Sequence, residues 1–332
     1  MNLVIYLAVL GISFLALIKG ADVFVDGACG VARLLRVPSL IIGLTVVSMG
    51  TSLPETAVSV TASLADSNEI AISNVLGSNI FNLLVVLGVC ALIRPVPVDR
   101  NVVKRDFPFT ILPAIGLFAL LCLPNLKSLL YAGSMDANVA QAGRITGIVL
   151  LVVFGIYIFI LAVEGKRCAA CACPDEDDNA PKSSGGALKY AFFIIIGCVL
   201  IIAGGKGAVW SAKLIAAMCG MSETLIGLTV VAIGTSLPEL ITSMVASRKG
   251  EAALAVGNAV GSSIFNLLFV LGASCAISPV TINLASVYDL AIFIFVSAVT
   301  MYFCYSRDKI SKFEGICLVF LYAADMVFAI AR

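Results

Sequence analysis

The chain has 332 residues, of which 61% are hydrophobic and only 12% are charged. Soluble domains are about 45–50% apolar and about 25% charged, so a water-soluble globule is excluded and a multi-spanning membrane protein is indicated. The formal net charge is +1, and no basic stripe points to nucleic acid as a partner.

Uncharged runs long enough to cross a bilayer, about 17–25 residues each, predict an all-α membrane protein with ten transmembrane helices. The first run has no basic segment before it and no obvious cleavage site, so we interpret it as a retained span rather than a signal peptide. The predicted spans lie at 3–18 (extending at most to 30), 40–64, 70–92, 107–123, 145–163, 190–205, 224–247, 252–276, 288–305 and 314–331.

One polar stretch, "EGKRCAACACPDEDDNAPKSSGGALK" at 164–189, separates the two sets of five. Its Pro, Gly, Ser and acidic content is typical of a flexible linker. The predicted organisation is an N-terminal five-helix half (1–163), this linker (164–189) and a C-terminal five-helix half (190–332). Cys168, Cys171 and Cys173 leave metal binding, redox sensing and lipidation open, but we favour incidental sequence in a loose linker.

Two thirteen-residue segments are nearly identical: "GLTVVSMGTSLPE" at 43–55 and "GLTVVAIGTSLPE" at 227–239. At a constant offset of 184, residues 43–88 and 227–272 match at 26 of 46 positions. The matches include Gly, Thr, Ser, Pro, Glu and Asn, which chance similarity between apolar helices does not favour, so they indicate a duplication. Because five predicted spans separate the two copies, they form inverted helical hairpins, an arrangement found in many secondary transporters.

Basic residues predict the orientation. The loops on the side of the linker carry sixteen of the twenty-one Lys and Arg residues, and the other side carries five. By the positive-inside rule, the linker is cytoplasmic and both termini are external. The expected location is the plasma (cell inner) membrane.

Each copy places a glutamate near the middle of a span, where a carboxylate costs roughly 2.5–3.5 kcal/mol on insertion scales. The preceding proline breaks the helix and frees a carbonyl four residues back, on a glycine that tolerates an unwound turn. Such irregular backbone is tolerated at membrane depth where it lines a cavity. The predicted helix-break residues are Gly50, Pro54, Gly234 and Pro238, beside the glutamates Glu55 and Glu239.

The two hairpins supply further oxygen atoms at the same depth. Their hydroxyls and amides belong to Thr51, Ser52, Ser78, Asn82, Thr235, Ser236, Ser262 and Asn266. Two carboxylates, two amides, hydroxyls and carbonyls make an all-oxygen set suited to Ca²⁺ or Na⁺. The absence of histidine excludes a histidine zinc site and a serine–histidine hydrolase.

The alternative to cation binding is that these polar residues have a purely structural role. Interhelical polar contacts hold membrane helices together, but they contribute about 0.6–2 kcal/mol, too little to require two charged groups beside repeated helix breaks. Asp22, Asp26, Asp289 and Asp325 have no repeat partners, so we interpret them as interface or local-pair residues.

The "GTSLPE" segments at 50–55 and 234–239, with "GSNIFN" at 77–82 and "GSSIFN" at 261–266, closely resemble the α-repeats of the calcium/cation antiporter superfamily. The likeness is strongest to the short prokaryotic-type sodium/calcium exchangers. It implies ten helices with a cation site at the midplane, formed by interrupted helices of two inverted five-helix repeats.

The resemblance also implies roles. Glu55 and Glu239 become the principal Ca²⁺ ligands, with carbonyls at Thr51 and Thr235. Na⁺ sites would use these glutamates, the hydroxyls of Ser78 and Ser262, and carbonyls near Ser48 and Ala232. It further implies exchange of three Na⁺ for one Ca²⁺, an electrogenic step, with the first and sixth spans sliding as a gate. Asn82 and Asn266 stand where some members carry Asp, which argues against K⁺ cotransport.

We therefore expect a secondary antiporter, not an enzyme, that exchanges Na⁺ for Ca²⁺ by alternating access. A Ca²⁺/H⁺ exchanger with the same glutamates is the alternative, and a gated cation channel is a more distant one. The expected partners are small inorganic cations and the lipid bilayer. No cofactor or protein partner is inferred, and a monomer suffices for transport.

Overall fold

The computed structural model describes residues 2–65, 68–125, 129, 134–135, 137–171, 184–219 and 232–331. The longer helices are α1 (Asn2–Leu35), α5 (Asn68–Phe81), α7 (Phe107–Cys122), α9 (Arg144–Cys171), α10 (Ser184–Met218), α14 (Ala252–Ile264), α16 (Leu284–Arg307) and α17 (Lys312–Ala331). The shorter ones are α2 (Ser39–Ile42), α3 (Ser48–Thr51), α4 (Leu53–Leu64), α6 (Leu87–Ile93), α12 (Ala232–Thr235), α13 (Leu237–Arg248) and α15 (Leu271–Ile277). Wider π-helical turns form η1 (Gly43–Val47), η2 (Asn82–Val86), η3 (Val102–Asp106) and η5 (Phe265–Val270).

The chain is a multi-pass membrane protein, as the sequence predicts. Within the described residues, eight helices are long and apolar enough to span a bilayer, and the bent pair Ser39–Thr51 and Leu53–Leu64 makes up to nine. The predicted span at 224–247 is described only from residue 232 onward, so the count of ten stays a prediction.

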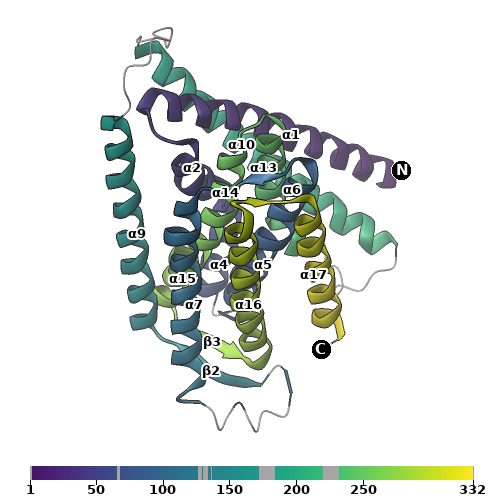
Figure 1. Cartoon of the computed structure of the whole chain (residues 1–332). Coiled ribbons are helices and arrows are strands. Elements are labelled where there is room, and N and C mark those ends of the chain that lie inside the picture. Colours follow the sequence, from purple (N-terminus) through teal and green to yellow (C-terminus); the bar gives the residue numbers. More distant parts are fainter. Residues whose placement is uncertain are drawn as a thin grey trace.

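Helix α1 runs further than the predicted first span, to Leu35. No proline interrupts the chain before Pro38, so the helix continues through the charged residues Lys19, Asp22 and Asp26. It lies beside α10, and the two cross the upright helices α7, α9, α16 and α17 at a steep angle (Figure 1). Glycines allow this approach: a Cβ on Gly20 would lie 2.8 Å from Leu200 Cβ.

Two helical hairpins occupy the centre of the molecule. The spans Glu69–Ile93 and Ala252–Ile277 have 72% and 78% of their most apolar window buried, against 11% for Lys312–Ala331 at the periphery. The first hairpin bends by 50° between α3 and α4, at Ser52, whose backbone leaves the helical conformation (φ −85°, ψ 12°). Ser236 has nearly the same conformation (φ −93°, ψ 6°). Pro54 and Pro238 each follow such a non-helical serine by two positions.

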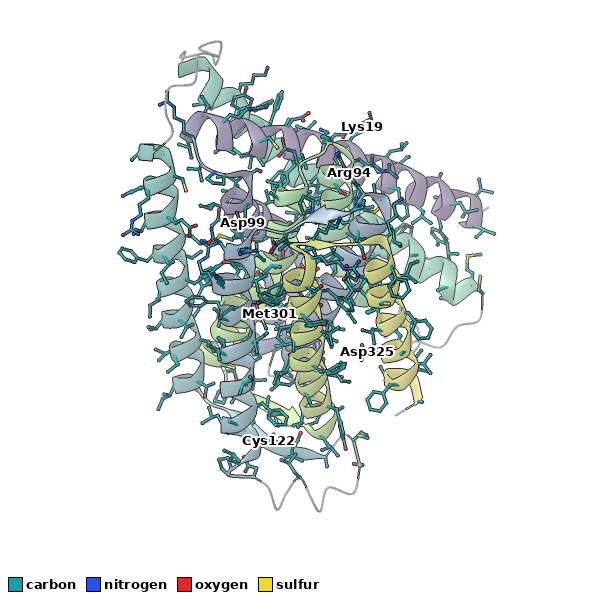
Figure 2. All side chains as sticks on the ribbon, viewed as in Figure 1. Lys19, Arg94, Asp99, Cys122, Met301 and Asp325 are labelled. Atoms are coloured by element: carbon teal, nitrogen blue, oxygen red, sulfur yellow. The ribbon has the colours of Figure 1, made fainter. Side chains whose placement is uncertain are left out.

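Two short strand pairs, absent from the sequence prediction, join loops at opposite ends of the bundle. Strand β1 (Val96–Pro97) pairs antiparallel with β4 (Lys309–Ile310), and β2 (Asn138–Ala142) pairs antiparallel with β3 (Val280–Asn283). We call the end where α9 finishes the linker face and the end with β2 and β3 the opposite face (Figure 1). Figure 2 shows Arg94 and Asp99 toward the linker face and Cys122 near the opposite face.

The predicted linker is described only at its edges. Helix α9 continues through Cys171, and α10 begins at Ser184. Cys168 is half-buried at the end of α9, whereas Cys173 and the side chain of Cys171 lie outside the described residues.

A buried ion-pair network joins η3 and α9. Arg105 donates to both carboxylate oxygens of the fully buried Asp106, at 2.6 and 3.0 Å. The hydroxyl of Tyr157 on α9 donates to Asp106 Oδ1 at 3.2 Å, and Arg105 also pairs with Glu164. A guanidinium held this way is costly to leave alone, because few water molecules can replace its partner.

We predict that Asp106→Ala destabilises the protein by about 2–3 kcal/mol, since Arg105 then keeps only Glu164 as a carboxylate partner. Tyr157→Phe, which removes one hydrogen bond from the same network, costs only about 1 kcal/mol. Thermal unfolding of both variants in one detergent measures the difference. Equal melting temperatures for the two variants contradict this view of the network.

Candidate cation-binding site

The two repeated glutamates lie in equivalent places. Glu55 is in the first turn of α4 and Glu239 is in the first turn of α13, each directly after a proline and a helix break. Both side chains are completely buried. The break turns each carboxylate into the protein interior, where a charged group requires partners.

The hairpins bond to each other reciprocally. Ser52, before Glu55 in the first hairpin, donates its hydroxyl to Glu239 Oε1 at 2.8 Å. Ser236, its equivalent in the second hairpin, donates to Glu55 Oε1 at 3.2 Å. The carboxylate of each half thus accepts a hydrogen bond from a serine hydroxyl of the other half, so the two glutamates share one site.

Several buried polar atoms of the two hairpins have no protein partner within the described residues. They include Glu55 Oε2, Glu239 Oε2 and both side-chain polar atoms of the fully buried Asn79, Asn82 and Asn266. Native proteins leave few buried polar groups unsatisfied, because each costs roughly 1–3 kcal/mol. Unpaired carboxylate oxygens and amides on the two hairpins fit a role in holding a cation.

Sequence analysis missed two amides, Asn74 and Asn258. Asn74 Nδ2 donates to the backbone carbonyl of Glu55 at 3.2 Å and to Ser59 Oγ at 2.9 Å. Asn258 Nδ2 makes the same pair of bonds in the second hairpin, to the carbonyl of Glu239 at 3.3 Å and to Ser243 Oγ at 2.8 Å. The two asparagines repeat at the offset of 184, which is the signal that could have found them.

The remaining predicted residues divide into three groups. Thr51 Oγ1 donates to Asn258 Oδ1 at 3.1 Å, and Ser262 Oγ donates to the carbonyl of Ser48 at 3.4 Å, so these residues also join the two hairpins. Ser78 and Thr235 line a cavity that reaches the site. Ala232 begins α12, and the structure describes only its backbone.

The predicted helix-break residues Gly50 and Gly234 both lie close to α10. The Gly50 carbonyl lies four residues before Pro54, and the thiol of Cys198 on α10 donates to it at 3.7 Å, a sulfur distance. A Cβ on Gly234 would lie 2.2 Å from Val209 Cγ2, so this break packs against α10 as well. Both helix breaks therefore lie against α10, which with α1 is one of the two strongly tilted helices.

Two cavities reach this region. One of about 750 Å³ is lined by Pro54, Thr235 and Pro238 together with residues of α10. The other, of about 460 Å³, is lined by Asn74, Ser78 and Thr235 together with the acidic residues Glu69, Asp289 and Asp325. Figure 2 shows Asp325 on α17.

Within the described residues, no three acidic, cysteine or histidine side chains come together as a metal-binding group. The site depends instead on two carboxylates, with amides, hydroxyls and backbone carbonyls around them. Such neutral oxygen donors suit hard cations that bind through oxygen.

Comparison with known proteins agrees with this geometry. The family described as "Sodium/calcium exchanger protein" matches residues 5–163 and 189–331. The inner membrane protein YrbG of Escherichia coli is 36% identical over 305 residues, covering 91% of this chain and 89% of YrbG. The sodium/calcium exchanger MaX1 of Methanosarcina acetivorans is 30% identical over 337 residues, covering 96% of each chain.

A solved structure has the same architecture. The sodium–calcium exchanger NCX_Mj, soaked with Na⁺ and no Ca²⁺, superposes with a TM-score of 0.79 at 29% sequence identity. The match covers 99% of each chain. The arrangement of helices around the paired glutamates is therefore shared over the whole length.

We predict that Asn258→Ala weakens Ca²⁺ binding about 5- to 30-fold, because the bonds that orient the Glu239 backbone and Thr51 are lost together. Asn74→Ala removes the equivalent bonds to the Glu55 carbonyl and to Ser59, so it weakens binding as well. Equilibrium binding of radioactive Ca²⁺ to the purified variants measures both. Ser243→Ala, which removes only the other acceptor of Asn258, serves as the control. A Ser243→Ala loss as large as that of Asn258→Ala contradicts the positioning role.

Proposed function

The chain belongs to the sodium/calcium exchanger protein family, and from that membership we propose that it exchanges Na⁺ for Ca²⁺ by alternating access at the site of Glu55 and Glu239. The family consists of membrane transporters, so the protein is a cation exchanger and not an enzyme. The ions carried and the ligands that hold them are inferred from the residues of the site.

The reciprocal bonding of the two buried glutamates carries the proposal. Each carboxylate receives one hydroxyl from the opposite hairpin and keeps one oxygen without a donor among the described residues. Both side chains are completely buried, and when ionised they together carry a charge of −2. One Ca²⁺ neutralises this charge, and so do Na⁺ ions.

We assign the central Ca²⁺ to the carboxylates of Glu55 and Glu239 with the backbone carbonyls of Thr51 and Thr235. Ca²⁺ takes six to eight oxygen ligands, and two carboxylates with carbonyls and water can supply them. The residues assigned to Na⁺ or to the centre of the site are Ser48, Ser52, Ser78, Asn82, Ala232, Ser236, Ser262 and Asn266.

The buried negative charge of the two glutamates also explains why the transport of one ion is coupled to the transport of another. With no cation bound, two buried carboxylates face each other in a medium that screens poorly, and an occluded state becomes costly. A carrier of this kind changes its open side only when loaded, so the export of one ion requires the return of another. Exchange of three Na⁺ for one Ca²⁺ would move one net charge per cycle and make transport electrogenic.

For the topology we propose ten spans in two inverted repeats. The equivalent bonds of Asn74 and Asn258, and of Ser52 and Ser236, support the repeat. The strand pairs do as well, since β1 and β3 begin 184 residues apart, at Val96 and Val280. The excess of basic residues supports a cytoplasmic linker face in the plasma membrane, with both termini external.

We predict that Glu55→Gln and Glu239→Gln each lower Ca²⁺ uptake at least about 100-fold, because each removes half the charge that holds the ion. Uptake of radioactive Ca²⁺ into liposomes measures the loss. Glu69→Gln removes an exposed carboxylate from the same hairpin and serves as the matched control. Wild-type uptake by either site variant contradicts the assignment.

The coupling ion is tested with wild-type liposomes loaded with Na⁺ and diluted into Na⁺-free buffer that contains radioactive Ca²⁺ at equal pH on both sides. Potassium on both sides with valinomycin holds the voltage at zero, and Glu55→Gln is the blank. We expect uptake that requires internal Na⁺. Uptake that instead requires an acid interior assigns the protein to Ca²⁺/H⁺ exchange at the same site, and flux with neither gradient indicates a channel.

A further inference from the structure

Lys249 connects the second hairpin to α1. It follows α13, at the turn into α14, and Gly250 takes the positive φ of 84° that this turn requires. Its ammonium lies 2.8 Å from Asp26 Oδ1, 2.9 Å from the backbone carbonyl of Asp22 and 3.5 Å from Asp22 Oδ1. One cation thus meets two carboxylates one helical turn apart on α1.

The two helices that Lys249 joins, α13 and α1, lie differently with respect to the cation site. Helix α13 begins beside Glu239 and ends next to Lys249, so it is part of the cation site. Helix α1 lies with α10 across the hairpins (Figure 1). A displacement of α1 relative to α13 must therefore separate Lys249 from at least one of its partners.

The equivalent place on the opposite face shows no such connection among the described residues. The offset of 184 relates Lys249 to Ala65, and Asp22 and Asp26 to Lys206 and Trp210. Ala65, Lys206 and Trp210 all line the cavity of about 750 Å³ that reaches the helix breaks. Where the linker face has ion pairs, the opposite face has open volume next to the site.

Exposure of equivalent apolar positions shows the same asymmetry. Ile70, at the start of α5, is 54% exposed, whereas its equivalent Leu254 on α14 is completely buried. Val58 on α4 is 36% exposed, and its equivalent Thr242 on α13 is completely buried. At these equivalent positions the hairpins are more buried toward the linker face than toward the opposite face.

We propose that Lys249, Asp22 and Asp26 form a latch that holds the linker face closed and so sets the balance between the two access states. The latch rests on alternating access, which is part of the proposed function. When the linker face opens, α1 moves relative to α13 and the latch separates. In the present conformation it stabilises the state open to the opposite face.

This role has a consequence that distinguishes it from general support of the fold. Removing the latch raises the population of the state open to the linker face, by about 2- to 10-fold for a partly exposed pair of contacts. Amides at the start of α14 and the end of α13 then exchange faster. Exchange of amides at the end of α4 and the start of α5 does not become faster, because the opposite face does not open more often than in the wild type.

Hydrogen–deuterium exchange of the purified full chain tests this without any transport assay. Lys249→Gln should raise exchange about 2- to 10-fold in 242–258 and leave exchange in 58–74 unchanged or lower. Arg248→Gln is the matched control, since it removes the neighbouring positive charge, and Arg248 makes no ion pair with α1 in the described part of the chain. The triple variant Asp22→Lys, Asp26→Lys, Lys249→Asp reverses the charges and should restore the wild-type pattern.

Three outcomes overturn the latch: equal exchange in Lys249→Gln and wild type, faster exchange at both faces, or the same effect in Arg248→Gln. The second would mean that Lys249 only supports the fold. Failure of Na⁺-driven Ca²⁺ uptake is a separate result, because the exchange pattern reports the two access states whichever ion is carried.

Discussion

The rest of the structure depends on one constraint, which is that the carboxylates of Glu55 and Glu239 are buried together in the protein interior. Among the described residues, Glu55 and Glu239 have no cationic side chain as partner, and each receives a hydroxyl hydrogen bond from the opposite hairpin. Because each hairpin supplies a hydroxyl to the other's glutamate, the two must meet at the centre. The helix breaks, the buried amides and the cavities are arranged around that meeting point.

Close packing makes the arrangement possible. A Cβ on Gly43 would lie 2.7 Å from the carbonyl of Leu254, and a Cβ on Gly257 would lie 2.6 Å from the carbonyl of Leu40. Glycine at both positions lets α14 approach η1 and α2 until their backbones touch. Asn82 and Asn266 both lie in wide π-helical turns, which occur often at functional sites. Backbone contact and wide turns thus place polar atoms of both halves within one small volume.

Similar sequences in the two halves have different surroundings, and this difference makes the linker face and the opposite face unequal. Ile70 and Leu254 are chemically alike, yet one is exposed and the other is buried. The charged residues of α1 differ from those of α10 at the same offset, so the described residues place the ion pairs between α1 and a hairpin on one face only.

The sequence by itself determined the membrane class, the repeated segments and the position of a glutamate directly after a proline in each; the cation-binding role of the oxygen atoms around Glu55 and Glu239 stays a prediction. These follow from local chemistry: apolar length, proline geometry and the cost of a buried carboxylate. It did not determine that Ser52 bonds Glu239 rather than Glu55, that Asn74 and Asn258 hold the glutamate backbones, or that α1 continues to Leu35 and meets Lys249. The Ser52 and Asp26 contacts join residues far apart in the chain, across 187 and 223 positions, and each asparagine reaches the glutamate 19 residues before it across the turn of its own hairpin. Only the tertiary structure decides them, because which hydroxyl reaches which carboxylate depends on how two hairpins pack, and a repeated sequence is compatible with either pairing.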